Sequence, residues 1–149
     1  MASVWLTGAE WLAVLRIGLG LWWLESWRHK DRKGWFERGT GIAWAADVAG
    51  KHRWAAVRGG FRKVVEPRPR AMAYLVVHAE LALGLGLVLG VLTPVALVCG
   101  LVLNLLYFIL MIHDWAEQGQ NAMMALISLV ALFALSWQTW SLDSALGLF

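Results

Sequence analysis

Four long apolar stretches constrain the fold of this chain more than any other feature. They cover about residues 10–27, 71–92, 94–112 and 121–140. A helix that crosses a bilayer needs roughly 20 mostly apolar residues. The whole chain is 60% hydrophobic and only 15% charged, whereas soluble domains carry about a quarter charged residues. The apolar excess therefore indicates lipid-facing surface, and each stretch is predicted to be a membrane-spanning helix.

The connections between these stretches differ greatly in length. Thr93 and Pro94 join the second stretch to the third, with Thr93 placed to cap a helix and proline at its tolerated first position. The sequence HDWAEQGQ joins the third to the fourth, and only the first connection, residues 28–70, is long. We therefore predict an all-α protein, a four-helix transmembrane bundle that forms one domain over residues 1–149.

The basic residues are concentrated in the long connection. It holds twelve of the thirteen lysines and arginines and carries a formal charge of +8, while the remainder of the chain carries −5. Short loops rich in Lys and Arg stay in the cytoplasm. The connection is therefore predicted to be cytoplasmic and both termini to lie outside. Because apolar stretches flank it, the basic block favours membrane lipids, and not nucleic acid, as its contact.

Apolar residues recur at roughly helical spacing within this connection: Ile42, Ala45, Ala49, Ala56, Phe61 and Val64. The positions between them include the basic residues that we expect to contact lipid or a partner chain: Lys51, Arg53, Arg58, Arg62 and Lys63. This pattern is typical of a basic amphipathic helix that lies in the membrane interface. Gly59 and Gly60 are candidate break points, and an irregular solvated loop is the alternative interpretation.

Polar residues inside the apolar stretches are costly to place in a bilayer and indicate function or tertiary pairing. The predicted intramembrane polar cluster consists of Arg16, Glu80, Asn104 and His78. Arg16 and Glu80 are expected to pair, with Asn104 beside them. The pair either fixes the helix register or lines a polar cavity for a quinone headgroup or a small anion. His78 lies about 200° around the helix from Glu80, so the two side chains are expected to face different neighbours.

Other residues have candidate roles in ring stacking and helix packing. Trp22, Trp23 and Tyr107 are candidates for stacking on a quinone ring. Gly84, Gly86 and Gly90 are predicted to let helices approach closely, as small residues do in membranes. No zinc-ligand spacing, nucleophilic triad or phosphate loop is present, and no second intramembrane histidine accompanies His78. We predict neither metal nor haem within this chain, and the sequence leaves enzymatic activity open.

Several motifs are similar to one membrane protein family. The segments RIGLGLWWLESWRHK, HAELALGLGLVLGVLTPVA and WSLDSAL resemble the DoxX/DoxD family of four-helix bacterial and archaeal membrane proteins. The matching positions are Arg16, Gly20, Glu80, Gly84, Gly90, Thr93, Asn121 and residues 140–143. The resemblance implies a multi-pass protein of the cytoplasmic membrane. DoxD-like members are the membrane subunit of thiosulfate:quinone oxidoreductase, so it also implies a quinone as cofactor and a partner subunit.

Two functions follow as expectations. The first is a membrane subunit of a quinone-linked oxidoreductase in electron transport, with its polar cluster around a quinone headgroup. The second is a non-catalytic accessory subunit of a larger respiratory or photosynthetic membrane complex. In that case the exposed tryptophans and the glycine-rich face would be contact surfaces.

Overall fold

The computed structural model describes residues 5–149, and within that range the protein is helical with no strand. The α-helices are α1 (Gly8–His29), α2 (Thr40–Gly50), α3 (Ala55–Val64), α4 (Pro69–Leu89), α5 (Thr93–Leu110), α6 (Trp115–Phe133) and α7 (Leu142–Leu146). A π-helical turn, η1 (Gly34–Arg38), precedes α2, and a 3₁₀ turn, η2 (Ser136–Gln138), precedes α7. The predicted all-α fold class is confirmed.

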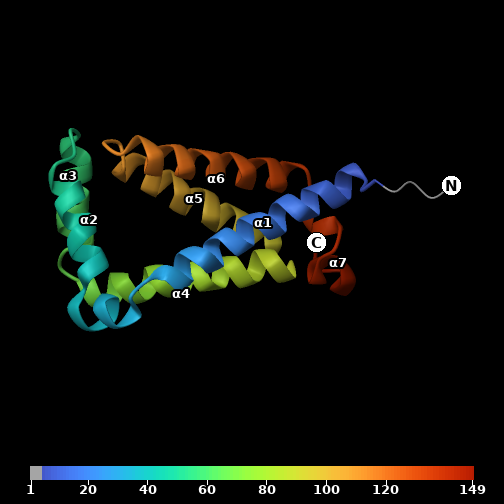
Figure 1. Ribbon diagram of the computed structural model, residues 1–149, viewed down its shortest axis with the longest axis horizontal. Helices are drawn as coiled ribbons and strands as arrows, with labels where there is room; N and C mark the ends of the chain where they lie inside the picture. The colour runs from blue at the N-terminus through green and yellow to red at the C-terminus, as the bar shows by residue number, and fades with distance from the viewer. Residues whose placement is uncertain (1–4) are drawn as a thin grey trace.

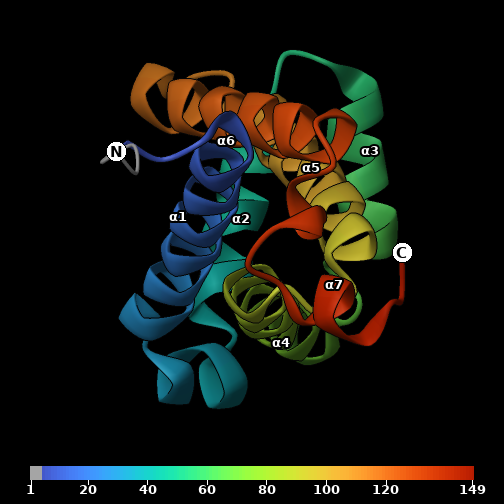
Figure 2. The ribbon, with the colours of Figure 1, turned by 90° about the vertical axis from the view of Figure 1, so that its right-hand side faces the viewer.

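The four long helices form two pairs that diverge from one another (Figure 1). Helix α1 packs along α4, and α5 packs along α6. The two pairs lie close together at the end that carries α7, here called the narrow end. They separate toward the opposite end, the wide end, which α2 and α3 cross. Figure 2, turned by 90°, shows α1 and α4 on one side of the molecule and α7 beside the end of α4.

Two of the long helices, α4 and α5, are long and apolar enough to cross a membrane. Helices α1 and α6 are of similar length, with 22 and 19 residues. They are less apolar overall, because α1 contains Arg16 and two glutamates and the first two turns of α6 are polar. The structure thus supports two of the four predicted spans by length and composition, and the other two remain predictions.

The predicted end of the fourth apolar stretch is wrong. Helix α6 stops at Phe133, not near residue 140, and the chain then turns at Leu135 and Trp140, which both have positive φ. This turn brings the short helix α7 against the loop between α4 and α5. The prediction failed because the apolar sequence continues through the turn, and hydropathy alone does not register a change of backbone direction.

The prediction that Thr93 caps the third apolar helix is also wrong. Thr93 is the first residue of α5, and its hydroxyl has no hydrogen-bond partner among the described residues. The buried carboxylate of Asp143 caps the helix instead. Its Oδ1 accepts from the Leu92 amide and its Oδ2 from the Thr93 amide, each at 2.7 Å. A carboxylate suits this position because the first amides of a helix lack partners within the helix.

The long connection is helical, so the alternative of an irregular loop is wrong. It forms two helices rather than one, and the break lies at residues 51–54 and not at Gly59 and Gly60, which lie inside α3. His52 causes the break by turning inward. Its Nδ1 accepts from the Trp54 amide at 3.0 Å, and its Nε2 contacts the Ile109 carbonyl of α5 at 2.9 Å. This buried histidine therefore fastens the α2–α3 corner to the α5–α6 pair.

Glycines set the close packing of α1 on α4. A Cβ atom at Gly20 would lie 2.8 Å from the Val88 backbone nitrogen, and one at Gly84 would lie 2.6 Å from the Leu24 side chain. The prediction that Gly84 serves helix packing agrees with this geometry. Gly90 has a different role, because it ends α4 in the left-handed conformation, with φ of 67°. Gly86 faces the turn at Val91 and the side chain of Ala96.

We predict that Gly20→Ala destabilises the protein by about 1–3 kcal/mol, because the new methyl group would overlap the α4 backbone. Gly18→Ala is the matched control, since a Cβ atom at Gly18 meets nothing within 4 Å. That control should be neutral or slightly stabilising, because alanine favours helix over glycine. Thermal unfolding of the detergent-solubilised variants, followed by circular dichroism, measures both effects. Equal melting temperatures would contradict the packing assigned to Gly20.

Candidate functional site

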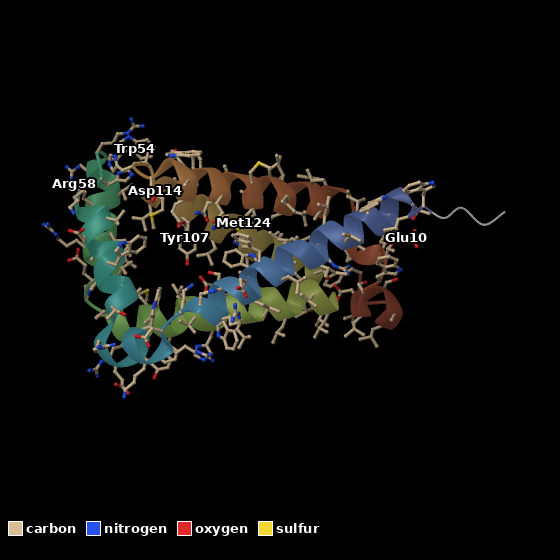
Figure 3. All side chains as sticks on the ribbon, viewed as in Figure 1. Glu10, Trp54, Arg58, Tyr107, Asp114 and Met124 are labelled. Atoms are coloured by element: carbon tan, nitrogen blue, oxygen red, sulfur yellow. The ribbon has the colours of Figure 1, made fainter. Side chains whose placement is uncertain are left out.

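A cavity of about 680 Å³ lies at the wide end, between the two helix pairs and α2–α3. This volume is within the range of sites that bind small molecules and cofactors. Its walls are mostly apolar and aromatic. Its polar side chains are those of Ser26, Lys30, Glu80, Asn104, Tyr107, Glu117, Gln120 and Asn121. Figure 3 shows the side chains of the helices around this space, with Tyr107 of α5 and Met124 of α6 labelled.

A buried ion pair is the strongest electrostatic feature of this cavity. The Lys30 Nζ, just after α1, lies 2.5 Å from the Glu80 carboxylate of α4. Glu80 is 1% exposed and the Lys30 side chain is 13% exposed. Lys30 also donates to the Ser26 hydroxyl at 3.1 Å, and its ammonium lies 5.2 Å from the centre of the Trp35 ring. Both members of the pair are thus held by additional contacts.

Hydroxyl groups from two neighbouring helices also lie beside the Glu80 carboxylate. The side-chain hydroxyls of Ser26 on α1 and Tyr107 on α5 lie close to it. Removing two opposite charges from water costs several kcal/mol for each ion, which their attraction often only balances. A buried network of this kind therefore adds little net stability to the contact between three helices. Its position in a cavity favours a functional role.

The predicted pairing of Arg16 with Glu80 is wrong. Arg16 is fully buried near the narrow end, where its guanidinium donates to four backbone carbonyls. The acceptors are those of Leu87 at 3.1 Å, Ser136 at 2.8 Å, Thr139 at 3.2 Å and Trp140 at 2.6 Å. The pairing was predicted from depth alone, and the sequence could not reveal that the chain after α6 folds back over Arg16. The arginine is therefore a structural residue outside the cavity.

His78 also lies outside the cavity. It is exposed on the outer face of α4, where its ring stacks with those of Tyr74 and Phe36 at centroid distances of 5.9 and 6.0 Å. Its Nδ1 contacts the Tyr74 carbonyl at 2.8 Å. The expectation that His78 and Glu80 face different neighbours agrees with this arrangement. Of the predicted polar cluster, the structure thus brings only Glu80 and Asn104 to the cavity.

All three predicted ring-stacking residues line the cavity. Trp23 is buried at 2% exposure, Tyr107 is half-buried, and Trp22 is 48% exposed at the edge. Trp22 also borders a second groove on the outer side of α1 and α4. The cavity therefore presents aromatic rings from α1 and α5 beside the ion pair.

Helices α2 and α3 cover the wide end with one apolar face. Ile42 and Ala45 of α2, together with Val57 and Phe61 of α3, line the cavity. Val64, predicted to belong to the apolar face, is 56% exposed, and Val65 lines the cavity instead. The side chains of Trp54 and Arg58 lie at the corner where α3 approaches the α5–α6 turn (Figure 3).

The predicted lipid-contacting basic residues are all exposed. Lys51 pairs with Asp47 at 2.6 Å, and the Arg53 guanidinium lies 5.3 Å from the centre of the Trp54 ring. Arg58 donates to the His52 carbonyl at 2.5 Å and to the Arg53 carbonyl at 3.1 Å. Arg62 and Lys63 are also exposed, near the end of α3. Helix α3 thus has a basic outer side and an apolar side toward the cavity.

Sequence reasoning missed three residues that shape this end of the molecule. Lys30 was counted only as part of the basic connection, although it follows Trp23 and Ser26 at helical spacing, which indicates a shared face. The inward turn of His52 and the capping role of Asp143 both depend on contacts between segments distant in sequence. No local pattern in the sequence marks those contacts.

Comparison with family models, curated proteins and solved structures found no match to this chain. The resemblance to the DoxX/DoxD family therefore remains a prediction from the motifs. Residues 5–149 contain no group of three or more His, Cys, Asp or Glu side chains arranged to hold a metal ion.

We predict that Arg16→Lys destabilises the protein by about 3 kcal/mol or more. An ammonium cannot reach four separated carbonyls, and each buried acceptor left without a donor costs about 1–3 kcal/mol. Arg28→Lys is the control, because this exposed arginine on the same helix pairs only with Glu25 and should change stability by about 0–1 kcal/mol. Chemical denaturation of both variants provides the comparison. An Arg16→Lys protein as stable as the wild type would contradict the structural role.

Proposed function

We propose that this chain is a multi-pass membrane protein whose cavity binds the ring of a lipid-soluble quinone, as the membrane subunit of an oxidoreductase. The observation that carries the proposal is the buried Lys30–Glu80 pair in a cavity lined by Trp22, Trp23 and Tyr107. A quinone ring has apolar faces for aromatic contact and carbonyl oxygens that accept hydrogen bonds. Its binding therefore needs apolar walls together with a few donors, which is the composition of this cavity.

The chemistry of quinone reduction also suits these side chains. A quinone that becomes a hydroquinone takes up two electrons and two protons. The electrons would come from a redox-active partner subunit, since this proposal assigns the chain the quinone site only. Lys30 and Tyr107 are proton-bearing donors beside the Glu80 carboxylate. These groups can hold a carbonyl oxygen and exchange protons at the atom where charge develops.

The proposed membrane topology has four spans, α1, α4, α5 and α6. At 1.5 Å of rise per residue, helices of this length approach the roughly 30 Å of a bilayer core. Many large apolar side chains on them are exposed, including Leu75, Leu106 and Phe133 at 61%, 58% and 78%. The basic connection would be cytoplasmic, and α2–α3 would lie in the membrane interface with the basic side of α3 toward anionic lipid headgroups.

A second candidate is the accessory subunit of a larger respiratory or photosynthetic membrane complex. One surface favours it. A groove of about 650 Å³ follows the outer side of α1 and α4, lined by residues that include Trp22, Trp27 and Leu85. This apolar groove is suited to a helix of another subunit. In this case the ion pair would only fix the helix positions.

We predict that Glu80→Gln weakens quinone binding about tenfold, because it removes the charge that orients Lys30 in the cavity. Purified protein is titrated with a short-chain benzoquinone, and quenching of tryptophan fluorescence reports binding. Glu25→Gln is the matched control, since Glu25 pairs with Arg28 at the surface and does not line the cavity. The double variant Lys30→Met with Glu80→Gln leaves no unpaired charge, so it separates loss of the site from loss of folding.

If Glu80→Gln binds the quinone as the wild type does, the ion pair has no part in a quinone site. Recovery of the chain in stoichiometric amounts within a large complex, with unchanged partner activity in Glu80→Gln, would favour the accessory subunit.

The topology makes a separate prediction. Cys99 is the chain's one cysteine, so Cys99→Ser provides a background without thiols for single-cysteine labelling. In intact bacterial cells a membrane-impermeant maleimide should label Leu148→Cys, whereas Glu66→Cys in the basic connection should react only after the cells are opened. Both positions are exposed in the structure. The reverse pattern would contradict a cytoplasmic connection.

A further inference from the structure

Asn104 differs from the other polar residues named at the cavity. Its side chain is fully buried, yet neither its Oδ1 nor its Nδ2 has a hydrogen-bond partner among residues 5–149. Unpartnered buried amide groups destabilise a fold, by about 1–3 kcal/mol for each group. Asn104 is among the residues that line the cavity, so a molecule bound there is the candidate partner for both groups.

A second free donor lies near Asn104. The Trp23 indole N–H is buried and has no partner within the described part of the chain. It faces Gly100, where an added Cβ atom would lie 3.5 Å from the Trp23 Nε1. Gly100 is one helical turn before Asn104 on α5, so the indole and the amide lie on the same side of that helix. Two elements, α1 and α5, thus present unpartnered groups to the same region.

Among the other polar side chains at the cavity, Glu117 and Gln120 are exposed to solvent, whereas Lys30, Glu80 and Asn121 have partners. Lys30 and Glu80 bind each other, and Asn121 donates its Nδ2 to the Glu117 carbonyl at 2.7 Å. Asn121 is therefore a close comparison, being an amide in the same cavity with a donor already used. The other buried side-chain groups without a partner in the described part of the chain are the hydroxyls of Thr93 and Ser136, which do not line the cavity.

The free groups and the ion pair lie at different depths. Helices α1 and α5 both run from the narrow end to the wide end (Figure 1). Lys30 follows Trp23 by seven residues, which is about 10 Å along α1. Tyr107, whose hydroxyl lies close to Glu80, likewise follows Asn104 by three residues on α5. Going inward from the wide end, a molecule would therefore meet Lys30 and Glu80 first, and Trp23 and Asn104 last.

We propose that Asn104 and Trp23 form an inner polar subsite, which makes the cavity selective for rings with oxygens at opposite ends, that is, para-quinones and their hydroquinones. This inference rests on the proposed function. The outer oxygen would contact Lys30 and Tyr107, and the inner oxygen would accept from the Trp23 N–H and the Asn104 Nδ2. After reduction, the Asn104 Oδ1 accepts from the new hydroxyl group, so one amide serves both oxidation states. A ligand with one polar end would leave the inner groups unpartnered.

The test compares 1,4-naphthoquinone with 1-tetralone, a bicyclic ketone of similar size that carries one oxygen. Calorimetric titration of the purified full-length protein is expected to give at least tenfold tighter binding of the quinone. Asn104→Leu, which keeps the side-chain volume, should weaken quinone binding about tenfold and remove most of this preference. Gln118→Leu, which changes a part-buried amide of α6 outside the cavity lining, is the control and should change the preference less than threefold.

A second measurement does not depend on the ligand. Asn104→Leu should raise the melting temperature of the unliganded protein, because it removes two buried polar groups that lack partners. A lower melting temperature would overturn the inference, since it would show that the amide has a structural partner.

The two proposals fail in different ways. If the wild type binds neither compound, the proposed quinone site is wrong, and the inner subsite falls with it. If the wild type binds both and Asn104→Leu keeps the preference, the inner subsite is wrong and the quinone site stands.

Discussion

The hydrogen bonds of one buried arginine fix the narrow end of this protein. The Arg16 guanidinium joins α1 to the end of α4 through the Leu87 carbonyl and to the turn after α6 through three further carbonyls. Asp143, in the short helix α7 that follows this turn, offsets the charge of Arg16 and caps α5. The end of α4, the start of α5 and the turn after α6 thus meet Arg16 of α1 in one network of backbone carbonyls, backbone amides and two opposite charges. Because the pairs are fixed here, they can diverge elsewhere.

The divergence of the helix pairs creates the space for the cavity. Gly20 and Gly84 hold α1 close to α4, while α5 packs along α6 and less closely against α4. The wide end would be open if α2 and α3 did not cross it, held by His52 on the Ile109 carbonyl. The long connection is therefore part of the cavity wall as well as a basic surface. A tightly packed four-helix bundle would have no room for a ligand of this size.

The polar groups of the molecule are divided between two functions. At the narrow end the charged groups of Arg16 and Asp143 have partners, as expected of a structural network, whereas the buried hydroxyls of Thr93 and Ser136 have none among the described residues. In the cavity, Lys30 and Glu80 are paired, but Asn104 and Trp23 retain free hydrogen-bonding groups. Free buried groups lower stability, so they are usually found where a ligand completes them. Asn104 and Trp23 line a cavity and Thr93 and Ser136 do not, which is the reason for assigning ligand binding to the wide end.

The sequence by itself determined the helical fold class, the approximate positions of the four long helices and the side of α4 that carries Glu80, because these follow from local hydropathy and helical periodicity. It also indicated three of the aromatic residues that line the cavity, Trp22, Trp23 and Tyr107. Only the tertiary structure decided which charges pair. Arg16 binds carbonyls of a turn 120 to 124 residues away along the chain, and Glu80 pairs with a lysine fifty residues earlier. Local patterns could not show this, since the partners of a buried charge depend on how distant segments fold together.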